Sequence, residues 1–326
     1  MTKEIICFSA NRTCHHDDYF SLINNIQSSK NIKKFLKKIS ILFTNKSIVY
    51  FDIDGLDLFF TPLIILRSIW GAKGLGISVR TEYLLESRNF HDLIFKRNRL
   101  IFLKSVTKKI LFFCVNNFSK TKIISIHKNQ KNNLKLKQYI NDFIYDPQLW
   151  DLELLNIKSI KPIELETFNF DDKKIILVAG RLNEQRSKQE LFNFLEKQSK
   201  FNFVLAGEML LNDFIKLKHI PNCFLINRFV TNEELIYLMT NSNLVYCFYT
   251  NDRPSGFFGR GIQLGKPVIV RKFSYLDSMF NEYKKQISIN HLDELINLNV
   301  NEIENQINEI NHYNDINKLK SFITSL

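Results

Sequence analysis

The sequence predicts an α/β protein of two domains, each built on a parallel β-sheet. Short apolar runs of strand length alternate with amphipathic helical stretches in both halves of the chain. A polar, proline-marked stretch at 157–172 separates the two halves. With 326 residues, each half can bury a core of its own. We therefore predict an N-terminal domain over 1–156, a linker over 157–172, a second domain over 173–300, and C-terminal helices over 301–326 that pack back on the first domain.

In the first half, apolar runs bounded by polar residues predict the strands. These lie at 4–9, 47–51, 76–80, 122–126 and 139–144. Helical spacing of apolar residues predicts helices at 31–41, 56–70 and 91–115. The order of elements therefore favours an open parallel sheet.

The second half repeats the alternation more clearly. Strands are predicted at 174–179, 201–206, 223–226, 244–248 and 268–270, and helices at 187–198, 231–239 and 257–264. Thr231 and Glu234 have the spacing of a capping box, which marks the start of the helix at 231–239.

The surplus of positive charge is confined to the first half. Residues 1–150 contain 24 Lys and Arg against 11 Asp and Glu, a net charge of +13, whereas the rest has 21 against 22. Such a basic half is typical of contact with nucleic acid, anionic membranes or phosphorylated ligands. The lysine-rich stretches 31–41 and 96–109 are either solvated surface helices or membrane contacts. They carry no nucleic-acid motif, so we expect no nucleic-acid partner.

The cysteines and the apolar segments indicate the compartment. Five cysteines at irregular spacing fit reduced thiols better than a disulfide framework. The first residues lack the apolar run of a signal peptide, and the longest apolar stretch, 56–70, is too short and too charged to span a bilayer. We therefore expect a cytoplasmic protein, at most peripheral on the inner face of the membrane.

The loop that follows the first strand contains Cys14, His15, His16, Asp17 and Asp18. These residue types could bind zinc, but they are adjacent and no second cluster follows at a suitable spacing. The loop is better interpreted as a polar loop at the carboxyl end of a strand, where α/β proteins bind ligands. We predict no metal site.

The stretch 251–271 (NDRPSGFFGRGIQLGKPVIVR) predicts a turn, a short helix, a second turn and a strand. Ser255 is the expected N-cap, and the backbone N–H groups of Gly256, Phe257 and Phe258 would face out of the helix end. A helix N-terminus suits a phosphate group. An ordinary structural turn fits the same residues equally well.

A second candidate is Gly180-Arg181-Leu182, which follows a predicted strand, with Arg186 five residues after Arg181. Two guanidinium groups and a helix N-terminus around one crevice would suit a diphosphate. The alternative is that both are plain surface arginines.

The order of these pieces resembles the C-terminal domain of GT-B glycosyltransferases, and most closely the large retaining group of family 4 type. The resemblance covers about residues 173–272, from Gly-Arg-Leu, through Ala-Gly-Glu and Arg-Phe-Val, to Ser-Gly-Phe-x-Gly and Gly-Lys-Pro-Val-Ile. It implies two Rossmann-like domains facing a central cleft, with a nucleotide-diphosphate sugar bound to the second domain.

The resemblance also implies roles for individual residues. Arg181 and Arg186, beside Gly180, would hold the donor diphosphate and steady it as the leaving group. Glu208 would face the cleft, and Phe229 and Val230 would lie along the base. Further donor contacts are implied for Asp252, Ser255, Gly256, Phe257, Phe258 and Arg260.

One departure from the family pattern concerns two glutamates that commonly precede the Gly-Lys-Pro turn. Their positions are occupied by Asp252 and Arg260, which removes the carboxylate implied for ribose binding. Some members with Ser-Gly-x-x-Gly-Arg also lack the pair, so the change is not interpreted as inactivation.

The chemistry implied for the family needs no cofactor beyond the sugar donor. Arginines and a helix end stabilise charge on the departing diphosphate, in place of a divalent metal. In the first domain, polar side chains on loops at carboxyl edges are candidates for catalysis (His16 and Asp17) and for acceptor binding (Arg80 and Glu82).

We therefore predict a glycosyltransferase that acts on a glycan or lipid-linked acceptor in surface polysaccharide synthesis, such as lipopolysaccharide or capsule. The alternatives are a nucleotide-sugar epimerase of the same fold and a non-catalytic basic binding module.

Overall fold

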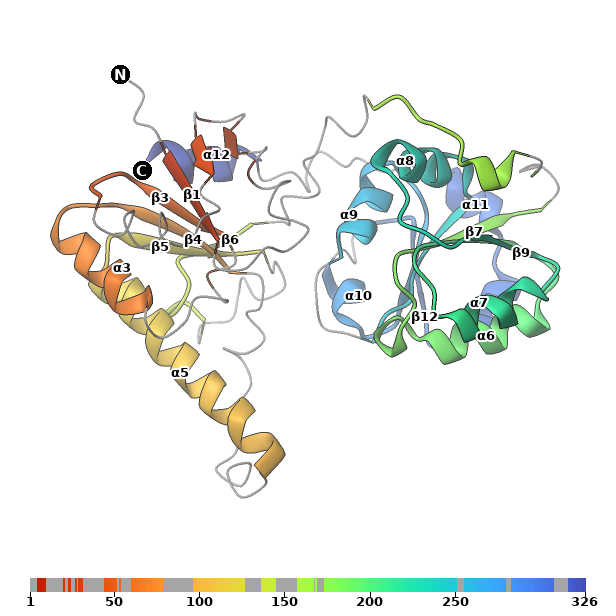
Figure 1. The fold of residues 1–326 in the computed structure, drawn as a ribbon, viewed down its shortest axis with the longest axis horizontal. Coiled ribbons are helices and arrows are strands. Elements are labelled where there is room, and N and C mark those ends of the chain that lie inside the picture. Colours follow the sequence, from red (N-terminus) through yellow and green to blue (C-terminus); the bar gives the residue numbers. More distant parts are fainter. Residues whose placement is uncertain are drawn as a thin grey trace. The chain divides into compact units, whose positions relative to one another are not determined.

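The computed structural model describes residues 5–9, 20, 23–24, 27, 29–31, 44–51, 53, 60–78, 96–126, 136–144, 157–166, 168, 173–250, 255–279, 283–307 and 316–326. The chain divides into two compact units. Unit 1 comprises Met1–Gln148 and Asn314–Leu326, and unit 2 comprises Leu149–Tyr313. Each unit contains a six-stranded parallel sheet with helices (Figure 1), which confirms the predicted α/β fold with two parallel sheets.

The sheet of unit 1 has the strand order β2-β1-β3-β4-β5-β6, and every neighbouring pair is parallel. The strands are β1 Ile5–Ser9, β2 Ser29–Asn31, β3 Ile48–Phe51, β4 Gly74–Ser78, β5 Thr121–Ser125 and β6 Asp142–Phe143. The helices are α3 Phe60–Ile69, α5 Lys96–Phe118 and α12 Ile316–Thr324.

Burial of apolar side chains explains why these segments form a sheet with helices against it. Phe8 and Tyr50 stack edge to face with ring centroids 5.9 Å apart. Ile64 of α3 and Phe112 of α5 belong to the same buried cluster, so both helices contribute to one core. Pro62 lies in the first turn of α3, where its missing N–H removes no helical hydrogen bond.

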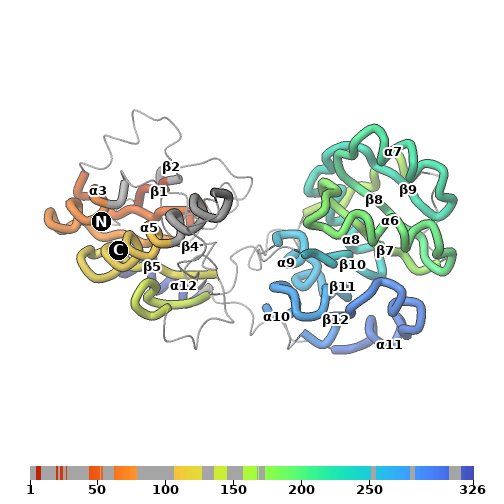
Figure 2. The backbone as a smooth tube through the Cα atoms, turned by 90° about the horizontal axis from the view of Figure 1, so that it is seen from below, coloured from red at the N-terminus to blue at the C-terminus, as the bar shows by residue number. Residues whose placement is uncertain are grey.

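The last helix belongs to unit 1 although it follows unit 2 in the sequence (Figure 2). Leu319 and Ile323 of α12 are fully buried. Lys318 Nζ donates to Asp142 Oδ1 at 2.7 Å, and Ser47 Oγ donates to the Leu326 carbonyl at 2.8 Å. An apolar face and polar ends therefore anchor α12 against the β-sheet of unit 1.

The sheet of unit 2 has the order β12-β11-β10-β7-β8-β9, again entirely parallel. The strands are β7 Ile175–Ala179, β8 Asn202–Ala206, β9 Cys223–Ile226, β10 Leu244–Cys247, β11 Val268–Arg271 and β12 Gln286–Ile289. The α-helices are α6 Lys188–Lys197, α7 Leu211–Lys218, α8 Asn232–Asn241, α9 Gly256–Gln263, α10 Tyr275–Met279 and α11 Val300–Glu304. Short 3₁₀ segments are η6 Ile163–Leu165, η7 Glu184–Arg186 and η8 Leu292–Asn297.

The stretch before β7 packs on unit 2. Leu165 is buried, and the rings of Phe168 and Phe224 lie 3.9 Å apart between centroids. The Ile160 N–H donates to the Glu233 carbonyl at 3.2 Å. Ile160, Leu165 and Phe168 therefore pack against the part of unit 2 that contains β9 and α8.

Several elements differ from the sequence predictions. Strand β2 was not predicted, because its three residues, Ser-Lys-Asn, carry no apolar signal. Helix α7 and strand β12 were also missed. Strand β4 begins two residues before the predicted start, at Gly74, whose lack of a side chain hides it from an apolar pattern. Most of the basic helix predicted at 31–41 lies outside the described residues.

No helix in the described part of the chain is both long enough and apolar enough to cross a bilayer. The cysteines within that part, Cys7, Cys114, Cys223 and Cys247, are free thiols.

Candidate functional site

The candidate site lies where the connections of the unit 2 sheet change direction. The chain runs outward through β7, β8 and β9, and then returns to place β10 on the other side of β7. Val245 of β10 is paired with Leu177 of β7, so the carboxyl ends of the two strands are adjacent. In open α/β sheets such a switch point is where ligands bind.

The segments that follow β7 and β10 are joined by several hydrogen bonds. The Thr250 N–H donates to the Gln185 carbonyl at 2.9 Å, and the Tyr246 hydroxyl donates to the Arg186 carbonyl at 3.1 Å. The Arg186 guanidinium lies over the Tyr249 ring, with its central carbon 5.1 Å from the ring centroid. The two segments therefore form one surface at the carboxyl edge of the sheet.

The two predicted arginines have different surroundings. Arg186 turns back under the loop and donates from Nη1 to the Ala179 carbonyl, and Asn183 Oδ1 accepts its backbone N–H at 3.2 Å. Arg181 is exposed, and its guanidinium takes part in no hydrogen bond or ion pair within the described part of the chain. Arg181 can therefore reach a ligand directly, whereas Arg186 first shapes the loop.

Two glycines allow this loop to fold closely. Gly180 has a φ of 92°, and a Cβ there would collide with the Arg186 guanidinium. Gly207, directly after β8, has a φ of 149°, and a Cβ there would lie 2.7 Å from the Gly180 carbonyl carbon and oxygen. The Gly180 N–H donates to the Ala206 carbonyl at 2.7 Å. Both positions therefore require glycine for space and for backbone conformation.

The N-terminus of α9 follows the β10 segment. Ser255 is its N-cap, as predicted, and the Ser255 Oγ accepts the Phe258 N–H at 3.3 Å. The cap therefore uses one of the three N–H groups expected to face a phosphate. No acceptor in the described part of the chain pairs with the N–H groups of Gly256 and Phe257. The Phe258 ring is buried in the core.

A cluster around Arg271, at the end of β11, was not predicted. Arg271 Nη2 contacts Glu190 Oε2 at 2.5 Å and Ser187 Oγ at 3.0 Å, and its guanidinium carbon lies 4.0 Å from the Phe248 ring centroid. Glu190 Oε1 and Arg271 Nε are buried without a hydrogen-bond partner in the described part of the chain. This cluster could not be recognised from spacing, because its members come from three separate elements.

Arg228 holds the segment predicted to lie along a nucleotide base. It pairs with Glu234 at 2.7 Å and with Glu164 at 2.8 Å, and it donates from Nη1 to the Phe229 carbonyl at 3.2 Å. The hydrogen bonds from Arg228 lower the pKa of both carboxyl groups. Phe229 is 74% exposed, so its ring is available for stacking.

The other predicted donor residues are placed as follows. Glu208 is exposed after Gly207, and Val230 is partly buried beside Phe229. Arg260 Nη1 is 3.4 Å from Asn232 Oδ1, at the start of α8. The remaining predicted residues, Asp252, His16, Asp17, Arg80 and Glu82, lie outside the described residues.

The polar groups buried beneath the site stay neutral. Burial raises the pKa of the Cys247 thiol to about 12, and it also raises the pKa of the Tyr249 hydroxyl. No cluster of three His, Cys, Asp or Glu suited to a metal occurs within the described ranges.

This architecture, with two parallel sheets and helices, is the GT-B fold. No protein-family model matches the sequence, and no curated protein matches it. Solved structures match over the full length. HepE from Anabaena, in complex with UDP and glucose, has a TM-score of 0.56 at 12% identity and covers 100% of this chain and 95% of its own.

Two further structures have the same fold. A putative UDP-N-acetylglucosamine 2-epimerase from Listeria monocytogenes has a TM-score of 0.58 at 13% identity, covering 99% of this chain and 96% of its own. WaaG, a glycosyltransferase involved in lipopolysaccharide biosynthesis, has a TM-score of 0.53 at 11% identity, covering 99% and 93%. At these identities the likeness shows the fold alone.

We expect the substitution Gly207→Ala to destabilise unit 2, because the added Cβ would push the Gly180 backbone out of place. Gly265→Ala is the matched control. Gly265 has a φ of 67° but nothing within 4 Å of its Cβ position, so that variant carries backbone strain alone, about 1–2 kcal/mol. Urea unfolding of the two variants should therefore show a larger loss of stability for Gly207→Ala. Equal losses in the two variants would contradict the close contact between Gly207 and Gly180.

The Arg228 pairs should make the stability of unit 2 depend on pH. Because the folded pKa of Glu164 is below its unfolded value of about 4.3, its contribution is present above that pH and is lost as the pH falls through the folded pKa. Being largely exposed, the Glu164 pair contributes at most about 1 kcal/mol.

Urea unfolding of Glu164→Gln and wild type at neutral and acid pH would measure this contribution. The stability difference should disappear at low pH. Glu166→Gln, an exposed neighbour, is the control and should match wild type throughout. A Glu164→Gln difference that persists unchanged at low pH would exclude the electrostatic origin.

Proposed function

We propose that this protein is a glycosyltransferase that moves a sugar from a nucleotide-diphosphate sugar to a glycan or lipid-linked acceptor. One observation carries the proposal. The exposed guanidinium of Arg181 follows strand β7, and the N–H groups of Gly256 and Phe257, which have no acceptor among the described residues, follow the adjacent strand β10. A cation and a helix N-terminus at one switch point suit a diphosphate. The full-length likeness to HepE, which was crystallised with UDP and glucose, supports the same ligand class.

The site would act mainly on the leaving group. As the bond between the sugar and the diphosphate loosens, negative charge grows on the phosphate oxygens. Arg181 and the end of α9 would stabilise that charge, and Arg186 would hold the loop that presents Arg181. A base such as uracil would stack on the exposed ring of Phe229.

We further propose a mechanism of the retaining, family 4 type. In this mechanism the acceptor hydroxyl attacks from the face that the leaving group vacates, and its proton passes to a phosphate oxygen. No protein base and no metal ion is then required. The order of the Gly-Arg-Leu and Ser-Gly-Phe motifs supports this assignment. Arg260, in place of a carboxylate, would leave the ribose to other contacts.

An epimerase that acts on UDP-sugars is the second candidate. The comparisons support it as well, since the Listeria protein of the same fold is a putative UDP-N-acetylglucosamine 2-epimerase. Epimerisation would use the same nucleotide site but no acceptor. The excess of positive charge in the first half of the chain favours the transferase, because an anionic or membrane-bound acceptor would be attracted to it.

For the cellular setting, we propose synthesis of a surface polysaccharide, such as lipopolysaccharide or capsule, on the cytoplasmic face of the membrane. WaaG, which has the same fold, is involved in lipopolysaccharide biosynthesis. The basic first half of the chain would give peripheral contact with anionic lipid.

Arg181→Ala should weaken UDP binding roughly 10- to 100-fold, the loss expected for one charge-assisted hydrogen bond of about 1.5–3 kcal/mol. The melting temperature should stay unchanged, because Arg181 has no described partner. Lys197→Ala, at the far end of α6, is the exposed control and should bind UDP normally. Isothermal calorimetry and thermal unfolding would measure both properties. Wild-type affinity in Arg181→Ala would show that the diphosphate binds elsewhere.

Incubation with UDP-sugars should separate the two candidate activities. With a donor and a membrane-derived glycan acceptor, a transferase should release UDP only when the acceptor is present. An epimerase should convert the donor into a second UDP-sugar without any acceptor. Chromatography of the nucleotide sugars would distinguish these outcomes, and acceptor-free conversion of the sugar would replace the first proposal with the second.

A further inference from the structure

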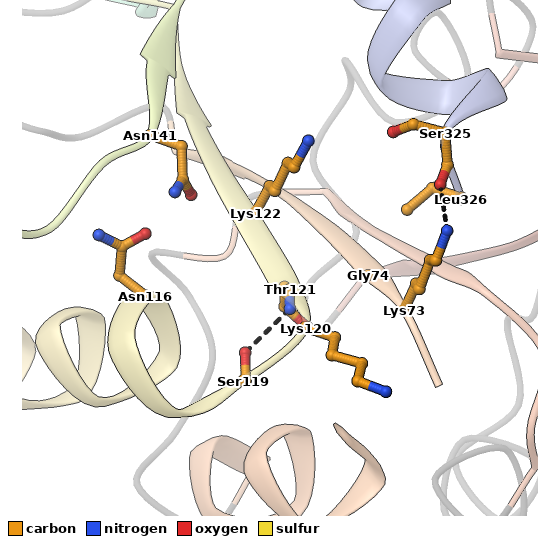
Figure 3. Close-up of a pocket in the computed structure, with 10 residues that line it drawn as sticks. All are labelled: Lys73, Gly74, Asn116, Ser119, Lys120, Thr121, Lys122, Asn141, Ser325 and Leu326. Carbon is orange, nitrogen blue, oxygen red and sulfur yellow. Dashed lines mark hydrogen bonds between the residues drawn. The ribbon is translucent and has the colours of Figure 1, made fainter. Parts of the chain in front are cut away.

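Unit 1 contains a pocket of about 410 Å³ at the edge of its sheet where β4 and β5 begin (Figure 3). Gly74 is the first residue of β4 and Thr121 the first residue of β5. Ligands of α/β proteins are expected at the opposite, carboxyl edge. The pocket is therefore separate from any site of the switch-point type. Its volume is that of a small-molecule site.

The lining of the pocket is basic and polar. It consists of Lys73, Gly74, Asn116, Ser119, Lys120, Thr121, Lys122, Asn141, Ser325 and Leu326. Three lysines are present, and no Asp or Glu occurs among the described lining residues. Like charges gathered in one place repel one another, so an anionic ligand would relieve this repulsion.

The lysines are only lightly engaged within the protein. Lys73 Nζ donates to the Ser325 carbonyl at 2.7 Å, and Lys122 Nζ lies over the Phe322 ring at 5.6 Å. Lys120 is exposed, and its ammonium group takes part in no hydrogen bond or ion pair within the described part of the chain. All three ammonium groups therefore keep donors for an oxyanion.

The pocket also offers an unused acceptor. Asn116 Nδ2 donates to the Gln138 carbonyl at 3.2 Å, whereas Asn116 Oδ1 is buried and has no partner in the described structure. Figure 3 shows the amide groups of Asn116 and Asn141 directed toward one another. A buried acceptor without a donor is costly, so a ligand hydroxyl is expected there. A phosphate that carries a polyol would satisfy both the lysines and this oxygen.

Exposed apolar side chains flank the same edge. Ile69 and Trp70, at the end of α3, are 73% and 55% exposed, and Phe118, directly before Ser119, is 65% exposed. The two helix ends are joined, because the Lys120 N–H donates to Ser68 Oγ at 2.8 Å. Apolar side chains and lysines at one corner are typical of a surface that enters the headgroup region of a bilayer.

We infer that this pocket binds the phosphate headgroup of an anionic membrane lipid, with Ile69, Trp70 and Phe118 inserted beside it. The inference rests on the membrane contact put forward under the proposed function and gives that contact a location. A polyol headgroup such as glycerol supplies hydroxyl donors for Asn116 Oδ1, and the phosphate pairs with Lys73, Lys120 and Lys122.

Cosedimentation with vesicles tests this site in the full-length chain. Wild type should bind vesicles of phosphatidylglycerol and phosphatidylcholine in equal parts, but not phosphatidylcholine alone. Replacement of Lys73, Lys120 and Lys122 by Gln should weaken binding roughly 100-fold. The control replaces Lys173, Lys200 and Lys218 by Gln and should bind as wild type does.

The control set is closely matched. Lys173 donates to a carbonyl as Lys73 does, Lys200 lies over a ring as Lys122 does, and Lys218 is as exposed as Lys120. If both triple variants lose vesicle binding to the same extent, the effect comes from net charge alone and the inference is wrong. Full vesicle binding by the pocket variant would also overturn it.

Two further questions are whether the phosphate belongs to a lipid and whether the pocket is independent of the proposed UDP site. Trp70→Ala with Phe118→Ala should reduce vesicle binding with all lysines intact. If inorganic phosphate binds the pocket while wild type ignores anionic vesicles, the lipid assignment is wrong. Calorimetry with UDP should give the same affinity for the pocket variant and wild type, so a failure of the donor-site proposal would appear separately in the Arg181→Ala titration.

Discussion

The candidate donor site depends on the hydrogen bonds and the cation–ring contact that join the segments following β7 and β10. These strands are neighbours in the sheet although more than sixty residues separate them in the sequence. The hydroxyl of Tyr246 and the backbone of Thr250 fasten the second segment to the first. Arg186 closes the contact by stacking on Tyr249 while it donates to the end of β7. This contact, together with the ladder between β7 and β10, holds the segment that carries Arg181 beside the segment that follows β10.

In this arrangement, two arginines that look equivalent in the sequence have different surroundings. Arg186 is bonded within the protein itself, whereas Arg181 is exposed and has no partner among the described residues. The glycines at 180 and 207 make this difference possible, since any side chain there would meet the guanidinium or the neighbouring backbone. Beneath the site, burial keeps the Cys247 thiol and the Tyr249 hydroxyl protonated. Stabilisation of charge, rather than proton transfer by a side chain, is the chemistry that such a surface favours.

The two units use the same parallel architecture in different ways. In unit 2 the polar groups gather at the carboxyl edge of the sheet, around the switch point. In unit 1 the described pocket lies at the amino edge, where lysines from two strands meet the end of α12. The surplus positive charge and the lysine pocket both belong to the first half of the sequence, whereas the candidate diphosphate site belongs to unit 2.

The sequence by itself determined the elements and the local chemistry. Apolar periodicity located ten of the twelve strands, the caps at Ser255 and Thr231 marked two helix starts, and the Gly-Arg-Leu and Ser-Gly-Phe motifs pointed to a phosphate. Only the tertiary structure decided which strands pair, because every parallel ladder makes the same backbone hydrogen bonds whatever its side chains. The return of β10 to β7, the Arg271–Glu190 cluster and the lysine pocket all join residues far apart in the chain. Local sequence patterns indicate burial and helix capping, but they carry no information about contacts between residues that are far apart in the chain.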